Sequence, residues 1–189
     1  KAIELQNIAF KFDDMQSPPI ANGMDYRHLD FNGLSTKAEQ IYFANDTISG
    51  KVKSLAMNEK SGLQIQQFKS QFFYGPKQAY LNDLYLRTPQ TELKDKIKVN
   101  YHSIATISKN IGDLSVDANL SQSRIGFKDI LLFAPQLRKM NPFQSNPNAV
   151  LSINSRVNGK VKDLNIPYFQ MQGIGHTKVS VSGKIAGLP

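Results

Sequence analysis

One short sequence pattern recurs along this chain and limits how it can fold. The string Gly-Lys-(Val/Ile)-x-x-Leu occurs at Gly50 to Leu55, at Gly159 to Leu164 and at Gly183 to Leu188. Looser copies that end in apolar-x-x-Leu occur at Phe31 to Leu34 and at Leu81 to Leu84. A sequence that repeats in this way predicts a fold built from one supersecondary unit used several times.

The apolar residues around the first copy change parity within it. Ile48, Gly50 and Val52 have even numbers, whereas Leu55 and Met57 have odd numbers. Alternate residues of a strand face opposite sides, so one regular strand would turn half of these side chains toward water. A β-bulge adds one residue and restores a single apolar face. The alternative is that two short strands meet there at a tight turn.

The same change of parity recurs at the other copies, so we predict irregular strand geometry in each of them. The expected positions are Asn32-Gly33, Lys53-Ser54, Asn82-Asp83, Lys162-Asp163 and Ala186-Gly187.

Alternating segments fill most of the chain and predict an all-β fold of roughly eleven strands in mainly antiparallel order. Turn signals separate them at Asn45-Asp46, Gly75-Pro76 and Pro89-Gln90. Asn158-Gly159 is the strongest hairpin turn signal. We expect residues 1–189 to form a single β-rich segment of a longer protein, because the chain starts at Lys1 without Met and stops directly after a repeat.

Two stretches break the alternation and predict helix. Ser103 to Asn110 could begin with a capping Ser. Phe127 to Met140 carries apolar residues at helical spacing, and Pro135 limits its first helix to about Lys128 to Phe133. Such a helix would cap or plug one end of the apolar face, either for stability alone or as a gate.

Composition excludes several kinds of chemistry. The chain has no cysteine, so disulfides and thiolate sites are absent. Its net charge of +8 suits an anionic partner, but Lys96 and Lys98 alternate with Ile97 and Val99, which is typical of the solvated face of a half-buried strand. A dedicated anion patch is the alternative. No run of apolar residues is long enough to span a membrane as a helix.

No catalytic motif is present, so we expect a protein that is not an enzyme and needs no metal or cofactor. His28, His102 and His176 lie far apart in sequence without a ligand at metal-site spacing, and we expect them at the surface or at strand edges. Phe68 and Phe72 near Lys69 could mimic a stacking platform for nucleic acid. Their parity is that of the buried face, so nucleic-acid binding is disfavoured.

Several stretches together resemble the TamB proteins of Bacteroidetes-type bacteria, within the AsmA-like group. The stretches are GKVKSLAM, FFYGPKQAYLNDLYLRTPQ, LSVDANLSQSRIGFKDILLFAP, GKVKDLNIPYFQMQ and VSVSGKIAGLP. They cover most of the chain, and their order is more specific than any one of them.

The resemblance implies a fold, a location and a task. Such proteins are anchored in the inner membrane of Gram-negative bacteria and cross the periplasm as a long, curved, mainly antiparallel sheet that forms an open U-shaped groove, the β-taco. The family is implicated in carrying phospholipid to the outer membrane, and in outer-membrane protein assembly and secretion with a BamA-like barrel partner. Neither the anchor nor the barrel-binding region can be matched to any residue here, so the partners expected of this segment are an acyl-chain ligand and neighbouring segments of the same chain.

The resemblance implies that the alternating apolar side chains of this sequence line the groove. These lipid-groove candidates are Val52, Leu55, Met57, Leu81, Leu84, Leu86, Leu114, Val116, Val161, Leu164, Ile166, Val179, Val181 and Ile185.

Two other functions stay open from the residues. A scaffold could capture outer-membrane protein strands at an exposed sheet edge by β-augmentation. A closed β-domain could act only as a spacer, its interior filled by its own Phe and Leu side chains. A conduit needs a continuous open apolar surface, whereas a scaffold needs an edge strand that can pair.

Overall fold

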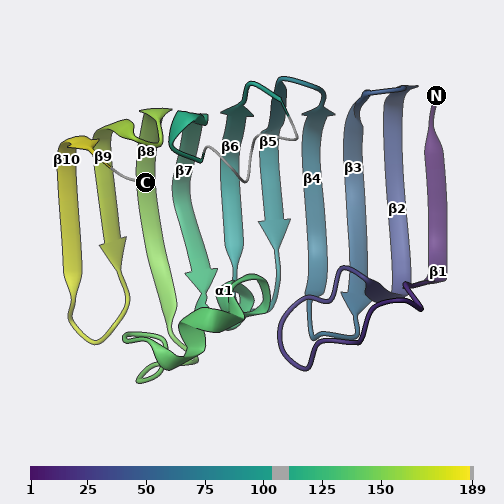
Figure 1. The fold of residues 1–189 in the computed structure, drawn as a ribbon, viewed down its shortest axis with the longest axis horizontal. Coiled ribbons are helices and arrows are strands. Elements are labelled where there is room, and N and C mark those ends of the chain that lie inside the picture. Colours follow the sequence, from purple (N-terminus) through teal and green to yellow (C-terminus); the bar gives the residue numbers. More distant parts are fainter. Residues whose placement is uncertain (104–110, 188–189) are drawn as a thin grey trace.

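Ten strands pair in chain order into one open antiparallel sheet (Figure 1). The computed structural model describes residues 1–103 and 111–187. The strands are β1 (Ile3–Asp13), β2 (His28–Ala44), β3 (Thr47–Glu59), β4 (Gln64–Tyr74), β5 (Gln78–Arg87), β6 (Glu92–Asn100), β7 (Ser115–Gly126), β8 (Val150–Lys160), β9 (Asp163–Gln172) and β10 (Lys178–Ala186).

Each strand pairs with its sequence neighbours because most connections are tight turns. Asn45-Asp46 joins β2 to β3, and the turns at Gly75-Pro76 and Pro89-Gln90 lie where the sequence predicts them. β1 and β10 are the two edges, since neither pairs with a strand on its outer side within the described residues. The prediction of an all-β fold with a long, open, mainly antiparallel sheet is confirmed, with ten described strands rather than about eleven.

The register separates the sheet into an apolar and a polar face. Residues that pair directly across an antiparallel ladder point to the same side. Leu81 pairs with Ile97, which pairs with Ala118, and this row is apolar. One residue along, Tyr80 pairs with Lys98, and this row belongs to the opposite, polar face.

Bulges keep the apolar side chains on one face along bent strands. All nine strand pairs contain at least one shift of register. Ser54 pairs with Lys37 and Val52 with Ala38, so Lys53 is the extra residue predicted in this copy of the repeat. The prediction is also confirmed at Asn32-Gly33 and Asn82-Asp83, where both ladders shift. Gly33 and Asp83 have positive φ values of 65° and 49°.

The other two full copies of the repeat contain no β-bulge at the predicted position. Lys162 and Val161 form the two-residue turn between β8 and β9, so the bulge prediction at Lys162-Asp163 is wrong and a tight turn stands there. Ala186 pairs regularly with Asp163, and β10 ends before Gly187, which has a φ of 83°. The bulge prediction at Ala186-Gly187 is therefore also wrong.

The predicted hairpin turn at Asn158-Gly159 is wrong as well. Both residues lie inside β8, where Asn158 pairs with Asn165 and Gly159 pairs with Leu164. Gly159 has a φ of 113°, and a Cβ there would meet the Asp163 carbonyl oxygen at 2.7 Å. The pairing places Leu164 on the apolar face, and this long-range match outweighs the local preference of Asn-Gly for a turn.

The predicted helix after β7 is confirmed as two short pieces. The α-helix α1 spans Phe127–Phe133 and the 3-10 helix η3 spans Pro135–Lys139, with the break at Ala134 just before the proline. A further 3-10 turn, η2, spans Ile111–Asp113. Of the predicted helix from Ser103 to Asn110, residues 104–110 lie outside the described residues.

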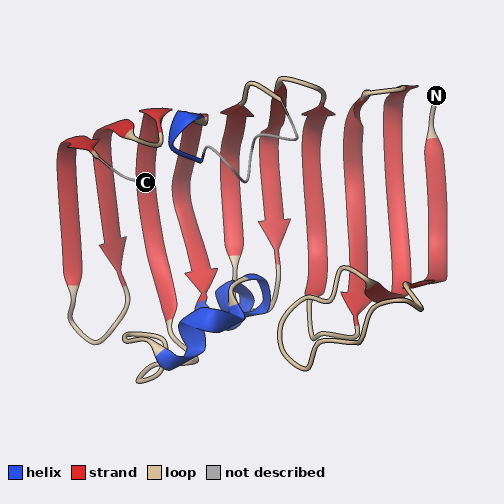
Figure 2. Cartoon of the chain, viewed as in Figure 1, coloured by secondary structure: helices blue, strands red, loops and turns tan. Residues whose placement is uncertain are grey.

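α1 caps one end of the sheet instead of covering its apolar face (Figure 2). Phe127 is only 1% exposed and packs on Phe143, with ring centroids 4.4 Å apart. The hydroxyl groups of Thr88 and Thr91, in the β5–β6 turn, donate to the Asp129 carboxylate at 2.6 and 2.5 Å. These contacts fix the helix at the strand ends.

Candidate functional site

The apolar side chains of the described strands form a continuous surface on one face of the sheet. We call it the open face. It includes the following apolar side chains, which the register places on one side of the ten strands: Ile3, Leu5, Ile8, Phe10, Phe12, Leu29, Phe31, Leu34, Ala38, Val52, Leu55, Met57, Phe68, Phe72, Leu81, Leu84, Leu86, Ile97, Val99, Val116, Ala118, Ile153, Val157, Leu164, Ile166, Phe169, Met171, Val179, Val181 and Ile185.

The open face is only partly shielded from solvent. At the edges, Phe10 is 49% exposed and Val181 is 41% exposed. Most side chains of the central strands are half-buried, and Leu84 and Ile166 are among the few that are fully buried. Large contiguous patches of exposed apolar surface mark interaction sites in proteins. The sheet does not close, which argues against a spacer whose interior is filled by its own side chains.

Most of the predicted lipid-groove residues lie together on the open face. Two lie elsewhere: Leu114 precedes β7, and Val161 is in the β8–β9 turn. The Val161 amide donates to the Leu114 carbonyl oxygen at 2.9 Å, so these two residues join strand ends rather than line the sheet. Val161 does not lie on the open face because the chain turns after Lys160. The parity of the apolar residues in the sequence did not reveal this turn.

Sequence reasoning missed the contribution of the first two strands to this surface. Ile8, Phe10 and Phe12 face the same side as Phe31 and Leu29 in the neighbouring strand. The rings of Phe10 and Phe31 stack with centroids 6.0 Å apart. The alternation of Ile8, Phe10 and Phe12 is visible in the sequence and would have been sufficient to predict that they belong to the apolar face.

Two buried serine side chains lie next to the β-bulges, and their hydroxyl groups do not make the open face polar. Ser70 is 2% exposed and donates to the Asn82 carbonyl oxygen at 2.9 Å. Ser123 is 1% exposed and accepts a hydrogen bond of 3.0 Å from the Lys94 amide. Each hydroxyl partners a backbone group where the register shifts, so the bulges expose few unpaired polar groups.

The opposite face carries the charges of the sheet. Lys96 pairs with Asp117 at 2.6 Å, and Lys53 pairs with Glu39 at 2.9 Å. The pKa of Glu92 is lowered, first by the hydrogen bond from Lys94 and then by that from Arg124. This arrangement is the predicted solvated strand face, with ion pairs among its lysines.

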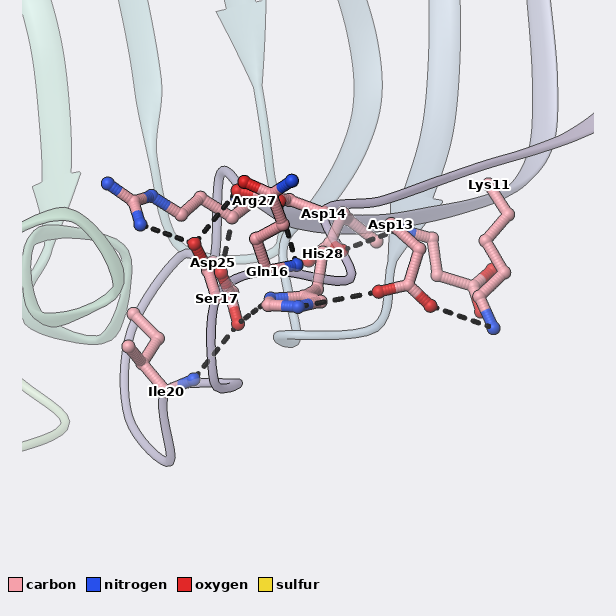
Figure 3. A network of polar contacts seen from close by, with 11 residues as sticks. Lys11, Asp13, Asp14, Gln16, Ser17, Ile20, Asp25, Arg27 and His28 are labelled. Atoms are coloured by element: carbon pink, nitrogen blue, oxygen red, sulfur yellow. Dashed lines mark hydrogen bonds and ion pairs between the residues drawn. The ribbon is translucent and has the colours of Figure 1, made fainter.

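A loop between β1 and β2 closes the capped end, and Figure 3 shows the polar contacts that hold it. The Asp25 carboxylate accepts hydrogen bonds from the amides of Ile20 at 3.0 Å and Arg27 at 3.2 Å. It also lies 3.0 Å from His28 Nδ1, while His28 Nε2 lies 3.4 Å from Asp13. The amide of Ile20 is the main cause of a lowered pKa at Asp25.

The expectation that His28 lies at the surface is wrong, because this residue is only 5% exposed. Carboxylates on both sides of the ring supply the partners that a buried imidazole needs. The loop also docks on the cap, because the Met24 amide donates to the Leu132 carbonyl oxygen at 2.7 Å.

Within residues 1–103 and 111–187, no group of three or more His, Asp or Glu side chains is placed to hold a metal ion. Across the same ranges, no helix has the length and apolar character needed to cross a membrane. The open face is therefore the candidate site that the described side chains support best, and it can act by binding apolar groups. Comparisons of the chain with protein-family models, with curated proteins and with solved structures gave no significant match.

Proposed function

We propose that the open face binds the acyl chains of phospholipids and carries them along the sheet. The observation that carries the proposal is the apolar surface that runs across all ten strands, over which the described part of the chain places no covering layer. Within residues 1–103 and 111–187, the elements that shield part of the sheet are α1, η3 and the loop after β1, which lie at the capped end.

The physical basis is the hydrophobic effect repeated at equivalent sites. Each methylene group removed from water contributes about 0.8 kcal/mol, so an acyl chain along the face is held without any specific chemistry. Adjacent strands lie about 4.8 Å apart and offer similar apolar rows, so a bound chain can shift from one row to the next at small net cost. No catalytic group is required, and we propose that the protein is not an enzyme.

The resemblance to TamB proteins supports a location for this activity. We propose that the chain is a segment of a periplasmic bridge in a Gram-negative envelope, where lipid passes between the inner and outer membranes. Neighbouring segments of the same chain would continue the sheet, and engagement of a BamA-like barrel would belong to regions other than this one.

Photo-crosslinking at adjacent residues tests acyl-chain binding directly. Val52 and Lys51 are neighbours on opposite faces of β3, and Leu81 and Tyr80 are neighbours on opposite faces of β5. A photoreactive amino acid at Val52 or Leu81 is expected to cross-link phospholipid from a membrane extract, detected by mass spectrometry. The same group at Lys51 or Tyr80 is the matched control and is expected to capture little. Equal capture on both faces, or none on either, would contradict the proposal.

Substitutions at exposed positions separate lipid binding from folding. Leu84 and Ile166 are buried, so Asp at either position would also disturb the fold. Val181 is 41% and Ile185 is 39% exposed, and Ser at both should reduce phospholipid co-purification with little loss of stability. Lys184→Ser on the polar face is the control. Undiminished lipid in the V181S/I185S variant would count against an acyl-chain site at β10.

A second function has one observation in its favour. β1 and β10 are open edges within the described chain, and all eleven residues of β1 are exposed. Such an edge could pair with an unfolded outer-membrane strand by β-augmentation. An Ala9→Pro substitution, which removes an amide from β1, should weaken capture of a strand peptide while leaving lipid cross-linking at Leu81 unchanged.

A further inference from the structure

A hollow lies over β7 to β10. Most of its lining side chains have the parity of the polar face, namely Arg124, Ser152, Asn154, Gln170, Gln172, Lys178 and Ser180, while Ile153, Met171 and Val179 between them belong to a row of the open face. Its volume is about 580 Å³, and its lining comes from these four strands, which lie side by side at one end of the sheet (Figure 1). The register shift between Leu120 and Ser123 lies beside it in β7, and Gln122 there has a φ of 46°. Bulges of this kind bend a strand and increase its twist.

Strand pairing arranges the lining side chains in rows. Asn154 pairs with Gln170, and Gln170 pairs with Ser180. Ser152 pairs with Gln172, and Gln172 pairs with Lys178. Since paired residues share a face, these two rows of amides and hydroxyls lie next to one another on the side opposite the open face.

The polar groups of these rows have hydrogen-bonding capacity that the protein does not use. The side chains of Asn154, Gln170, Gln172 and Ser180 make no hydrogen bond or ion pair with any part of the chain that the structure describes. Elsewhere on the polar face, Asn119 bonds to Asp95 and Asn165 bonds to Asn158. Each free amide offers two donors and an acceptor, and each hydroxyl offers both functions.

This combination of groups suits a ligand that both donates and accepts hydrogen bonds at closely spaced positions, as the hydroxyl groups of a sugar do. Binding single-stranded nucleic acid would need aromatic stacking platforms and several free cations. The hollow has no aromatic lining residue among those described, and of its two cations, Arg124 is engaged by Glu92 at 3.0 Å. Lys178 makes no ion pair with a described residue, so it can meet a carboxylate on the ligand.

We propose that the polar hollow of β7 to β10 binds a saccharide that carries an acidic group. Amides in the Asn154–Gln170–Ser180 row hydrogen-bond the sugar hydroxyls, and Lys178 pairs with the acidic group. The proposal does not rest on the proposed lipid function, because the amides and the lysine that it uses have the parity of the polar face.

Titration with two tetrasaccharides, followed by amide NMR shifts, tests this inference. The probes are a hyaluronan tetrasaccharide, which contains glucuronate, and chitotetraose, which is neutral. Hyaluronan is expected to shift the amides of residues 152–154, 170–172 and 178–180, and to bind several-fold more tightly than chitotetraose. Absence of shifts with both sugars, shifts centred elsewhere on the chain, or equal affinity for the two would overturn the proposal.

Variants keep the test independent of folding. N154A/Q170A removes two exposed or half-buried amides from one row, and a tenfold or greater loss of hyaluronan affinity is expected. K178Q is expected to remove the preference for hyaluronan over chitotetraose. Gln71→Ala, an exposed amide on the same face of β4, is the matched control and should bind like the original chain. Unchanged affinity in N154A/Q170A, with its NMR spectrum otherwise preserved, would also overturn the site.

Discussion

The hydroxyl group of Ser70 donates a 2.9 Å hydrogen bond to the carbonyl oxygen of Asn82, across the β4–β5 pair where the register shifts. Ser70 has the parity of the open face and yet is almost fully buried. Asn82 immediately precedes Asp83, where the β-bulge lies, and this bulge keeps Leu81 and Leu84 on one face. By bonding the Asn82 carbonyl oxygen, the Ser70 hydroxyl therefore stabilises the bulge.

We expect Ser70→Ala to lower the free energy of unfolding by about 1 to 3 kcal/mol, because it leaves the Asn82 carbonyl buried without its partner. Urea denaturation measures the change. Ser182→Ala, at an exposed position of β10, should stay within about 0.5 kcal/mol of the original chain. An equal effect of the two substitutions would show that the hydroxyl at the bulge contributes nothing specific.

Gly50, the glycine of the first copy of the repeat, lies in a closely packed environment. A Cβ at this position would lie 2.4 Å from Ile41 Cδ1 and 3.1 Å from the Phe72 ring. Gly50→Ala should therefore destabilise the chain by about 1 to 3 kcal/mol through overpacking. Ile41→Val removes the Cδ1 atom, so the double variant should lose less stability than the two single variants added together. Strict additivity in denaturant unfolding would contradict a contact between these residues.

Gly23→Ala should loosen the loop that docks on the cap. Gly23 has a φ of 87°, and a Cβ there would lie 2.9 Å from the Leu132 carbonyl oxygen, which accepts the Met24 amide. We expect faster hydrogen exchange at the Met24 amide. Gly62→Ala is the control, because Gly62 has a φ of 103° but nothing within 4 Å of the added Cβ. If both variants accelerate exchange at Met24 equally, backbone strain rather than the contact is responsible.

The same loop should open in acid. The pKa of Asp25 is lowered, mainly by the Ile20 amide and also by the Arg27 amide and His28. A lowered folded-state pKa means that this stabilisation is fully present above the ordinary carboxyl pKa of about 3.9 and is lost as the pH falls through the folded-state value. Exchange at the Ile20 and Arg27 amides, corrected for its intrinsic pH dependence, should therefore rise below about pH 4.

Asp25→Asn should remove this acid dependence at Ile20 and Arg27. The Gln16 amide should keep an acid dependence of its own, because the pKa of Asp14 is also lowered, first by the Ser17 hydroxyl and then by the Gln16 amide. Asp83→Asn, at an exposed carboxylate without a described hydrogen bond, is the control. Persistence of the acid effect at Ile20 in the D25N variant would assign it to another group.

Alternation of apolar residues was sufficient to predict the all-β class, the separation of the two faces and the bulges at Lys53 and Asp83. These features are local, because the two-residue period of a strand links residue number to face. The helix after β7 and its break before Pro135 were predictable for the same reason, since helical spacing and proline act over a few residues.

Features that depend on pairing between strands were not predictable in this way. The string Gly-Lys-Val-x-x-Leu forms a bulge at Gly50 to Leu55 and a hairpin turn at Gly159 to Leu164, and the difference lies in the register of the neighbouring strands. The placement of Val161 off the open face follows from that turn. The burial of His28 depends on Asp13 and Asp25, which come together only when the loop closes.

The sequence by itself determined which side chains are apolar at alternate positions, and therefore that a sheet of these strands has one apolar and one polar face. Only the tertiary structure decided that the sheet stays open, that α1 caps its end and that the polar hollow forms at β7 to β10. Strand parity is a property of consecutive residues, whereas closure, capping and curvature depend on the register of pairs separated in sequence and on backbone angles at the bulges.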